Sequence, residues 1–111
     1  MKELSFDAMV SILEEVYEKL LLQLPEELRS LPYETIALSE EERRLKKGIR
    51  KYYVLRGYYH KQGKKKSKVL ACYSGDINMQ KVNALIYLYR LVKYLDEALN
   101  YGQALRGCVK I

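Results

Sequence analysis

The tract from Arg43 to Lys68 constrains this chain more than any other stretch. It reads RRLKKGIRKYYVLRGYYHKQGKKKSK, in which 12 of the 26 residues are Lys or Arg and none is Asp or Glu. Like charges at this density repel one another, and they are costly to bury without partners. Packing alone rarely demands such a run, so we expect an anion to neutralise these charges.

A nucleic-acid backbone is the simplest anion of matching length and charge. We expect this tract to contact phosphates with little sequence preference, while its tyrosines either stack on bases or pack in the core. The alternative for the tract is a solvated helix face followed by a lysine-rich loop. The candidate nucleic-acid-binding residues are Arg43, Arg44, Lys46, Lys47, Arg50, Lys51, Arg56, Tyr58, Tyr59, His60, Lys61, Lys64, Lys65, Lys66 and Lys68.

The charge is divided unevenly along the chain. Residues 1–42 hold eleven acidic and three basic residues, a net charge of −8. Residues 43–111 hold three acidic and seventeen basic residues, a net charge of +14, and the two parts sum to +6. With 49% hydrophobic residues, we expect residues 1–111 to form one domain. The uneven charge would give a molecular dipole if the two parts occupy different faces, and it lets an acidic helix lie against a basic one.

The first part of the chain has the periodicity of an amphipathic helix. Apolar residues recur every three or four positions from about Phe6 to Leu24. Ser5 is placed to cap this helix, and Pro25 ends it. The segment PEELRSLP, residues 25–32, predicts one short helical turn.

The middle of the chain gives a second helix signal. Ser39 and Glu42 form a capping box, which predicts a basic amphipathic helix as far as Tyr53. Beyond it, two strand-like tracts surround a polar, Gly-containing loop, which favours a basic β-hairpin over residues 52–73. The alternative is one long helix that continues to about His60.

A third helix is predicted from about Ile77 to Tyr101. Asp76 can cap its start, and Gly102 is a plausible stop. Residues 108–111 could then form a final short strand. The predicted fold class is therefore mainly α, a small three-helix domain with a β-hairpin, and the alternative is an all-α bundle with a long second helix.

The third helix is apolar on two sides. One side carries Leu85, Leu88, Val92, Leu95 and Leu99, and it predicts the core. Tyrosines recur every seven residues on the opposite side, and a small domain can hardly cover both sides. We expect a second copy of the chain to cover the tyrosines, in a homodimer that sets two basic tracts side by side. The candidate interface is Tyr87, Arg90, Tyr94 and Tyr101.

The same tyrosines support a second functional hypothesis. The chain would be a protein-interaction or assembly subunit, such as a small viral or accessory protein, and the basic tract would then meet an acidic partner. Abundant Lys, Glu and Tyr, with a single Thr and three Asn, favour a thermophilic source.

Signals for catalysis are missing from the sequence. The chain has one histidine, no phosphate-binding glycine loop and few converging carboxylates, so we expect no enzyme, no cofactor and no metal site. Cys72 and Cys108 are too few for a zinc site, although they could form one bridge. With no membrane-length apolar run and no signal peptide, an intracellular, cytoplasmic protein is expected.

Overall fold

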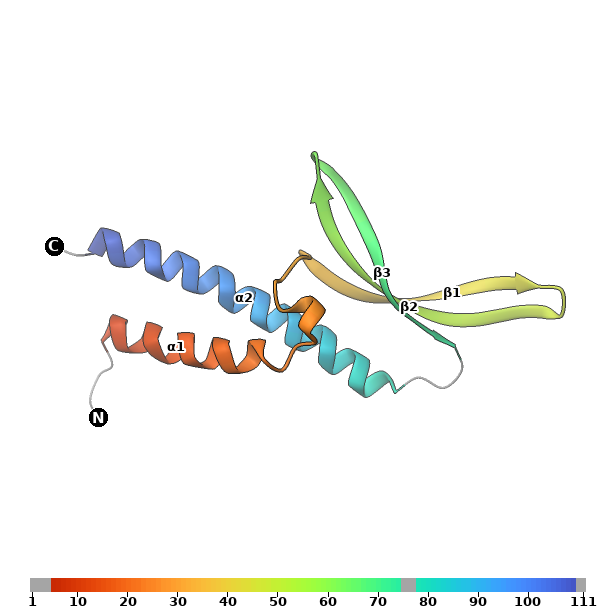
Figure 1. Ribbon diagram of the computed structural model, residues 1–111, viewed down its shortest axis with the longest axis horizontal. Coiled ribbons are helices and arrows are strands. Elements are labelled where there is room, and N and C mark those ends of the chain that lie inside the picture. The colour runs from red at the N-terminus through yellow and green to blue at the C-terminus, as the bar shows by residue number, and fades with distance from the viewer. Residues whose placement is uncertain (1–4, 75–77, 110–111) are drawn as a thin grey trace.

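The computed structural model describes residues 5–74 and 78–109, with side chains as far as Gly102. The elements run along the chain in the order shown in Figure 1. They are the helix α1 (Phe6–Leu21), the 3-10 turn η1 (Glu26–Leu28), the strands β1 (Thr35–Leu45), β2 (Gly48–Lys61) and β3 (Lys64–Ser74), and the helix α2 (Met79–Val109).

The fold is α+β, so the predicted mainly α, three-helix class is wrong. The described residues form two α-helices and a three-stranded antiparallel sheet of order β1-β2-β3. The predicted helix from Ser39 to Tyr53 is replaced by the end of β1, a two-residue turn and the start of β2. The predicted hairpin over residues 52–73 is present as β2 and β3, and the alternative of a long second helix is wrong.

The capping box failed as a helix signal because it is local. A cap contributes about 1 kcal/mol. In β1, Ile36 is fully buried and Leu38 packs partly buried against the same core, in the period-two pattern of a strand. Burying one such side chain contributes roughly 1.5–3 kcal/mol, so core packing outweighs the cap. The three glutamates then continue the strand instead of starting a helix.

Strand β2 is shared by two hairpins that diverge. It pairs with β1 from Tyr58 back to Gly48, and with β3 from Tyr52 on to Lys61. Each end of β2 therefore has one neighbour, and only its middle has two. Figure 1 shows the two hairpin ends pointing in different directions. We call residues 43–51 the first arm.

The second arm consists of residues 59–66. A register shift between Leu55 and Arg56 separates it from the centre of the sheet, and such irregularities increase strand twist. The arms make the molecule long, with extents of 70 × 38 × 21 Å and a radius of gyration of 19.0 Å. A compact chain of this length would have a radius of gyration of about 13 Å. Much of the sheet therefore lies outside the core.

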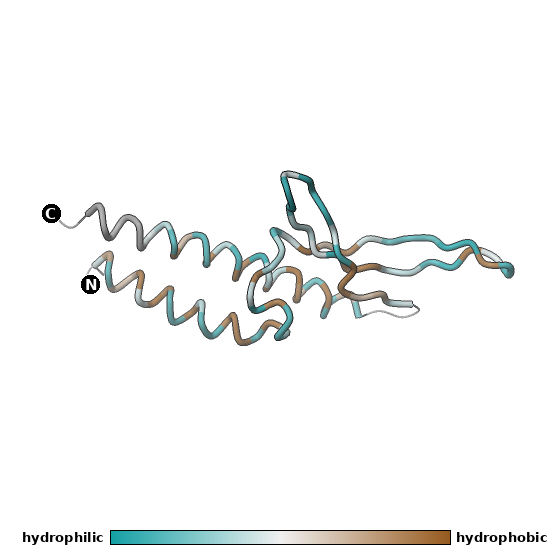
Figure 2. Tube along the Cα trace, turned by 45° about the horizontal axis from the view of Figure 1, so that its top comes forward, coloured by the Kyte–Doolittle hydropathy of each residue, from teal (hydrophilic) through white to brown (hydrophobic). Residues whose placement is uncertain are grey.

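The core lies where α2 crosses the centre of the sheet. Figure 2 shows hydrophobic residues gathered at this crossing and along the two helices. Val92 is fully buried there, as predicted, while Leu85 and Leu88 are partly buried at the edge. The buried cluster is Leu24, Leu28, Tyr33, Ile36, Leu55, Val82, Ile86, Tyr89 and Val92.

Tyr89 and Gly57 hold the segment before β1 in place. The buried Tyr89 hydroxyl accepts a hydrogen bond from the Tyr33 N–H at 2.9 Å and donates one to the Tyr33 carbonyl oxygen. A Cβ atom at Gly57 would lie 2.5 Å from Cγ of the Tyr33 ring. The ring of Tyr33 therefore needs a glycine beneath it, which explains the glycine at position 57 in the middle of β2.

The start of the chain agrees with its predicted local structure. The side chain of Ser5 caps α1 by accepting from the Ala8 N–H at 3.1 Å, and η1 provides the short turn expected after Pro25. Helix α1 ends at Leu21, three residues earlier than predicted. The Tyr17 hydroxyl donates to Asp96 Oδ1 of α2 at 3.0 Å, so the two helices are joined by a hydrogen bond as well as by packing.

Helix α2 is longer at its C-terminal end than predicted. It continues past Gly102 to Val109, so the predicted stop at that glycine is wrong, as is the final strand over residues 108 and 109. Asn78 caps its start by accepting from the Lys81 N–H at 3.2 Å. The predicted cap, Asp76, lies outside the described residues.

Candidate nucleic-acid interface

The first arm presents its charges around a two-residue turn. Lys46 and Lys47 form the turn, and Gly48 follows with a φ of 130°, a backbone conformation that favours glycine. Arg43 pairs in register with Arg50. These side chains are exposed. Basic side chains therefore surround a narrow tip.

The second arm repeats this arrangement with a different turn. Gln62 and Gly63 have φ values of 54° and 76°, as expected for the type I′ turn that suits a two-residue hairpin. Lys61 and Lys64 are paired directly before and after the turn. Lys65 Nζ lies 5.3 Å from the centre of the Tyr58 ring, a cation–π contact.

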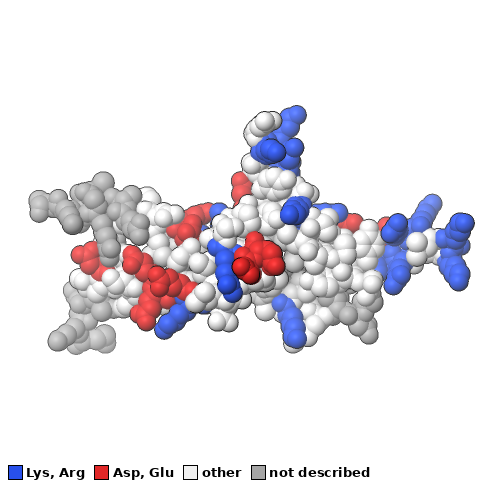
Figure 3. All heavy atoms as spheres, in the orientation of Figure 1, with Lys and Arg blue, Asp and Glu red and all other residues white. Residues whose placement is uncertain are grey.

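Most of these cations have no acidic partner within the part of the chain that the structure describes. Figure 3 shows Lys and Arg gathered at both arm ends, while much of the acidic surface in view lies over the helices. Within the described ranges, no carboxylate forms a salt bridge with the following predicted residues: Arg43, Arg44, Lys46, Lys47, Arg50, Lys61, Lys64, Lys65, Lys66 and Lys68.

Three predicted binding residues do pair with carboxylates, which lie in β1 or directly before it. Lys51 Nζ lies 3.7 Å from a Glu40 oxygen, and His60 Nδ1 lies 2.6 Å from a Glu34 oxygen. Arg56 forms a salt bridge with Glu41. Lys51 and His60 lie at the inner ends of the two arms, and Arg56 lies between the arms, so these three residues already have a carboxylate partner.

Glu41 is the centre of a small network where the first arm begins. It accepts from Arg56 and, through Oε2, from the Tyr52 hydroxyl at 3.1 Å. The Arg56 hydrogen bond lowers the pKa of the Glu41 carboxyl, and the Glu41 carboxylate in turn raises the pKa of the Tyr52 phenol. The Arg56 guanidinium is therefore already paired with a carboxylate of the same chain.

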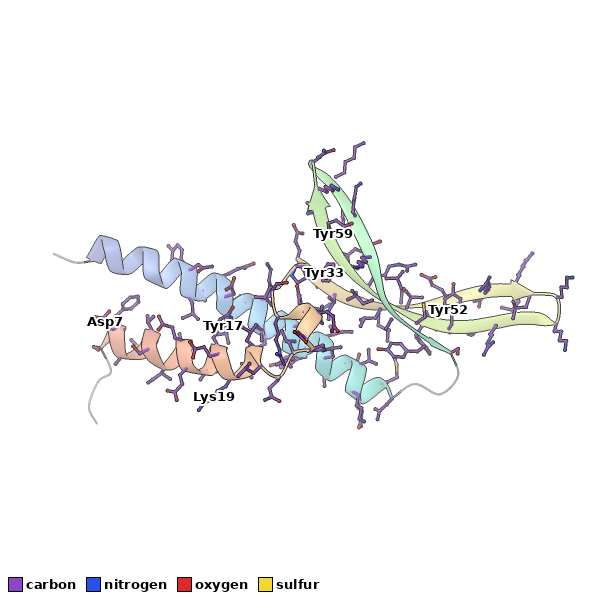
Figure 4. The ribbon with its side chains drawn as sticks, viewed as in Figure 1. Asp7, Tyr17, Lys19, Tyr33, Tyr52 and Tyr59 are labelled. Atoms are coloured by element: carbon purple, nitrogen blue, oxygen red, sulfur yellow. The ribbon has the colours of Figure 1, made fainter. Side chains whose placement is uncertain are left out.

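A hollow of about 450 Å³ lies at the base of the first arm. Arg43 and Arg50 lie across from each other in it, and Tyr52, two residues after Arg50, shares their face of the sheet. Figure 4 shows Tyr52 on this part of the sheet. Ligand sites commonly have volumes of roughly 300–1,000 Å³, so one nucleotide would fit.

The sequence did not identify the rest of this hollow. Cys72, Tyr73 and Ser74 line it from β3. Their place beside Arg43 and Arg50 depends on the register of three strands, in which Ser74 pairs with Tyr52. Only a correct strand register for residues 39–53 would have brought these side chains together.

The predicted tyrosine ligands differ in their surroundings. Both Tyr58 and Tyr59 are partly exposed. The Tyr59 ring lies 6.2 Å from the ring of Tyr33, so it packs at the edge of the core (Figure 4). The Tyr58 ring instead makes the cation–π contact with Lys65. Tyr52 at the hollow is therefore the tyrosine best placed to meet a ligand.

The predicted interface residues lie far along the chain from the arms. Tyr87, Tyr94 and Tyr101 have exposed fractions of 69%, 71% and 69%, and Arg90 is exposed beside them. They occupy the side of α2 that faces away from Val92. The described residues 5–36 therefore leave this side of α2 uncovered.

Other classes of site have no counterpart in the described part of the chain. Across residues 5–74 and 78–102, no three His, Cys, Asp or Glu side chains gather into a group that could hold a metal ion. Cys72 is free and exposed, while the side chain of Cys108 lies outside the described set. Neither described helix is long and apolar enough to cross a membrane.

Comparisons with protein-family models, with curated proteins and with solved structures find no match to this chain. The function must therefore be argued from its geometry and charge.

Proposed function

We propose that this chain is a non-enzymatic nucleic-acid-binding protein that holds the phosphate backbone with its two arms. The observation that carries the proposal is that ten basic side chains with no carboxylate partner among the described residues lie on or beside two projecting hairpins. Cations without a carboxylate partner on a projecting hairpin gain the most binding free energy from a polyanion. The reason is that contact releases the counterions that phosphates otherwise hold. An intracellular location is part of this proposal.

The composition of the second arm favours phosphates over base edges. Direct readout of bases relies on Arg, Asn and Gln in fixed positions. The second arm presents mainly lysines, which act as mobile point charges, and Gln62 is its one side-chain amide. We therefore expect this arm to bind nucleic acid with little sequence preference.

The hollow at the base of the first arm suits one nucleotide of the bound strand. Arg43 and Arg50 would contact a phosphate there, since guanidinium groups match phosphate oxygens in geometry. Tyr52 is held through its hydroxyl by Glu41, and its ring would stack on a base.

The test is salt-dependent binding of labelled duplex and single-stranded DNA and RNA. If about six duplex phosphates are contacted, log K should fall with log salt with a slope near −5. The double variants Lys46→Ala/Lys47→Ala and Lys65→Ala/Lys66→Ala should each flatten the slope by about 1 to 2 units.

A charge-matched control removes two lysines outside the arms. Lys19→Ala/Lys81→Ala lowers the net charge equally but changes α1 and the start of α2. It should leave the slope within about half a unit of wild type. An equal effect of all three variants, or no binding at low salt, would show that the arms are not the binding surface.

A further inference from the structure

The uncovered side of α2 has a regular repeat that continues beyond the three tyrosines. Positions 84, 87, 91, 94, 98 and 101 follow one another at alternating spacings of three and four residues. Alternation of this kind over about two and a half heptads is the pattern of helices that pair along their length. These positions hold Ala84, Tyr87, Leu91, Tyr94, Ala98 and Tyr101.

The sizes of these residues favour antiparallel pairing. One set of positions holds only Tyr, and the other holds Ala, Leu and Ala. In a parallel pair, equal positions meet, so Tyr would crowd Tyr while Ala faced Ala across a gap. In an antiparallel pair the two sets meet, and each Tyr packs against a smaller residue of the partner, which fills space evenly.

The charges beside this repeat select one register. Arg90 and Glu97 are exposed, and neither forms a salt bridge within the part of the chain that the structure describes. Antiparallel registers in which the Tyr positions still face the Ala and Leu positions of the partner differ from one another by seven residues. Shifting in one direction sets Arg90 against the partner's Arg90, and shifting in the other sets Glu97 against the partner's Glu97. Only the middle register sets Arg90 against the partner's Glu97, and symmetry makes that pair twice.

We infer that α2 mediates an antiparallel homodimer in this middle register. Tyr87 then faces the partner's Ala98, and Leu91 faces the partner's Tyr94. The two-fold axis passes between residues 92 and 93. Such an interface is isologous, because the same patch serves both copies. The inference rests on the described face of α2 and does not depend on the binding of nucleic acid.

This geometry changes how two binding surfaces are presented. The sheet packs on the N-terminal half of α2, through Val82, Ile86 and Tyr89. Antiparallel pairing therefore puts the two sheets, with their arms, at opposite ends of the dimer. The basic tracts would lie apart, in contrast to the side-by-side placement expected from the sequence. A dimer of this shape would join two segments of nucleic acid.

Sedimentation equilibrium of the full chain, at concentrations up to about 100 μM, tests the dimer. Wild type should dimerise, and Tyr94→Glu should be a folded monomer, because Tyr94 is 71% exposed and adds little to the core. Ile12→Glu, at a 48% exposed apolar position of α1, is the matched control and should remain a dimer. A monomeric wild type, or dissociation by Ile12→Glu with Tyr94→Glu still dimeric, would overturn the inference.

Charge exchange tests the register. Arg90→Glu and Glu97→Arg should each weaken dimerisation by at least about tenfold, since each sets like charges together twice. The double variant Arg90→Glu/Glu97→Arg should recover the wild-type dissociation constant to within about threefold. If the double variant is weaker than either single variant, the register is wrong.

Distance measurement tests the direction. A spin label at Ala84→Cys, with Cys72→Ser and Cys108→Ser, lies opposite the partner's position 101. The two labels are then about 26 Å apart along the axis, because seventeen residues rise about 1.5 Å each. Electron paramagnetic resonance should report a separation of that order. A separation near 10 Å would show a parallel pair.

Discussion

The centre of strand β2 and its two ends lie in opposite surroundings. At the centre, Leu55 and Gly57 are buried against the core, and each has a strand on either side. At the ends, Arg50 and Lys61 are exposed and each has a single neighbouring strand. The arms therefore gain little from burial, and they persist because the register set at the centre continues outward.

This difference separates stability from binding. Substitution at the centre should destabilise the fold and leave the charges of the arms unchanged, whereas substitution in the arms should change binding and leave stability nearly constant. Buried residues around the centre should therefore show larger effects on stability than exposed residues of the arms and helices.

Ile36→Ala should lower the free energy of unfolding by about 3 to 4 kcal/mol, because Ile36 is fully buried and its truncation leaves a cavity. Ile49 in the first arm is 61% exposed, and Ile49→Ala should change stability by less than about 0.5 kcal/mol. Urea titration followed by circular dichroism measures both. Similar losses for the two variants would mean that the arm is part of the core.

Gly57→Ala should cost about 2 to 3 kcal/mol, since the new methyl group would overlap the Tyr33 ring. The clash is specific, so Tyr33→Leu should reduce the additional cost of the alanine. A double-mutant cycle from thermal melts measures this coupling. Strict additivity of the two substitutions would show that the ring does not lie over the glycine.

Tyr89→Phe should cost about 1 to 2 kcal/mol, because it leaves the buried N–H and carbonyl of Tyr33 without their partner. Tyr94→Phe on the exposed side of α2 makes the same chemical change and should cost less than about 0.5 kcal/mol. Chemical denaturation at low protein concentration, where a dimer does not contribute, gives both values.

The smallest effect concerns pH at the base of the first arm. Arg56 lowers the pKa of Glu41 in the folded state. The stabilisation is therefore present above the unfolded pKa of about 4.3 and is lost as pH falls through the folded value. Melting temperatures of wild type and Glu41→Gln should differ at pH 7 and converge toward pH 3.

Glu42→Gln is the control for this pH dependence. Glu42 is exposed, and within the described residues it forms no salt bridge, so its substitution should change stability by less than about 0.5 kcal/mol at either pH. A gap between wild type and Glu41→Gln that widens on acidification would contradict the role given to Arg56.

The sequence by itself determined the features that depend on neighbouring residues. The cap at Ser5, the turn after Pro25 and the hairpin around Gln62 and Gly63 are each encoded within a few positions. The excess of positive charge in residues 43–68 was also visible in the sequence, whereas the burial of Val54 and Leu55 within that tract was not.

Only the tertiary structure decided the conformation of residues 39–53 and the division of the basic tract into two arms. Local periodicity favoured a helix there, because Leu45, Ile49, Tyr52 and Tyr53 fall on one side of a helix, and that interpretation was wrong. The choice depended on pairing of β1 with the middle of β2 and on packing of both against α2. Gly57 beneath Tyr33, and Tyr89 bonded to the same residue, join positions 24 and 56 residues apart. Such non-local contacts leave no signal in a short stretch of sequence, yet they contribute the burial that local preferences cannot match.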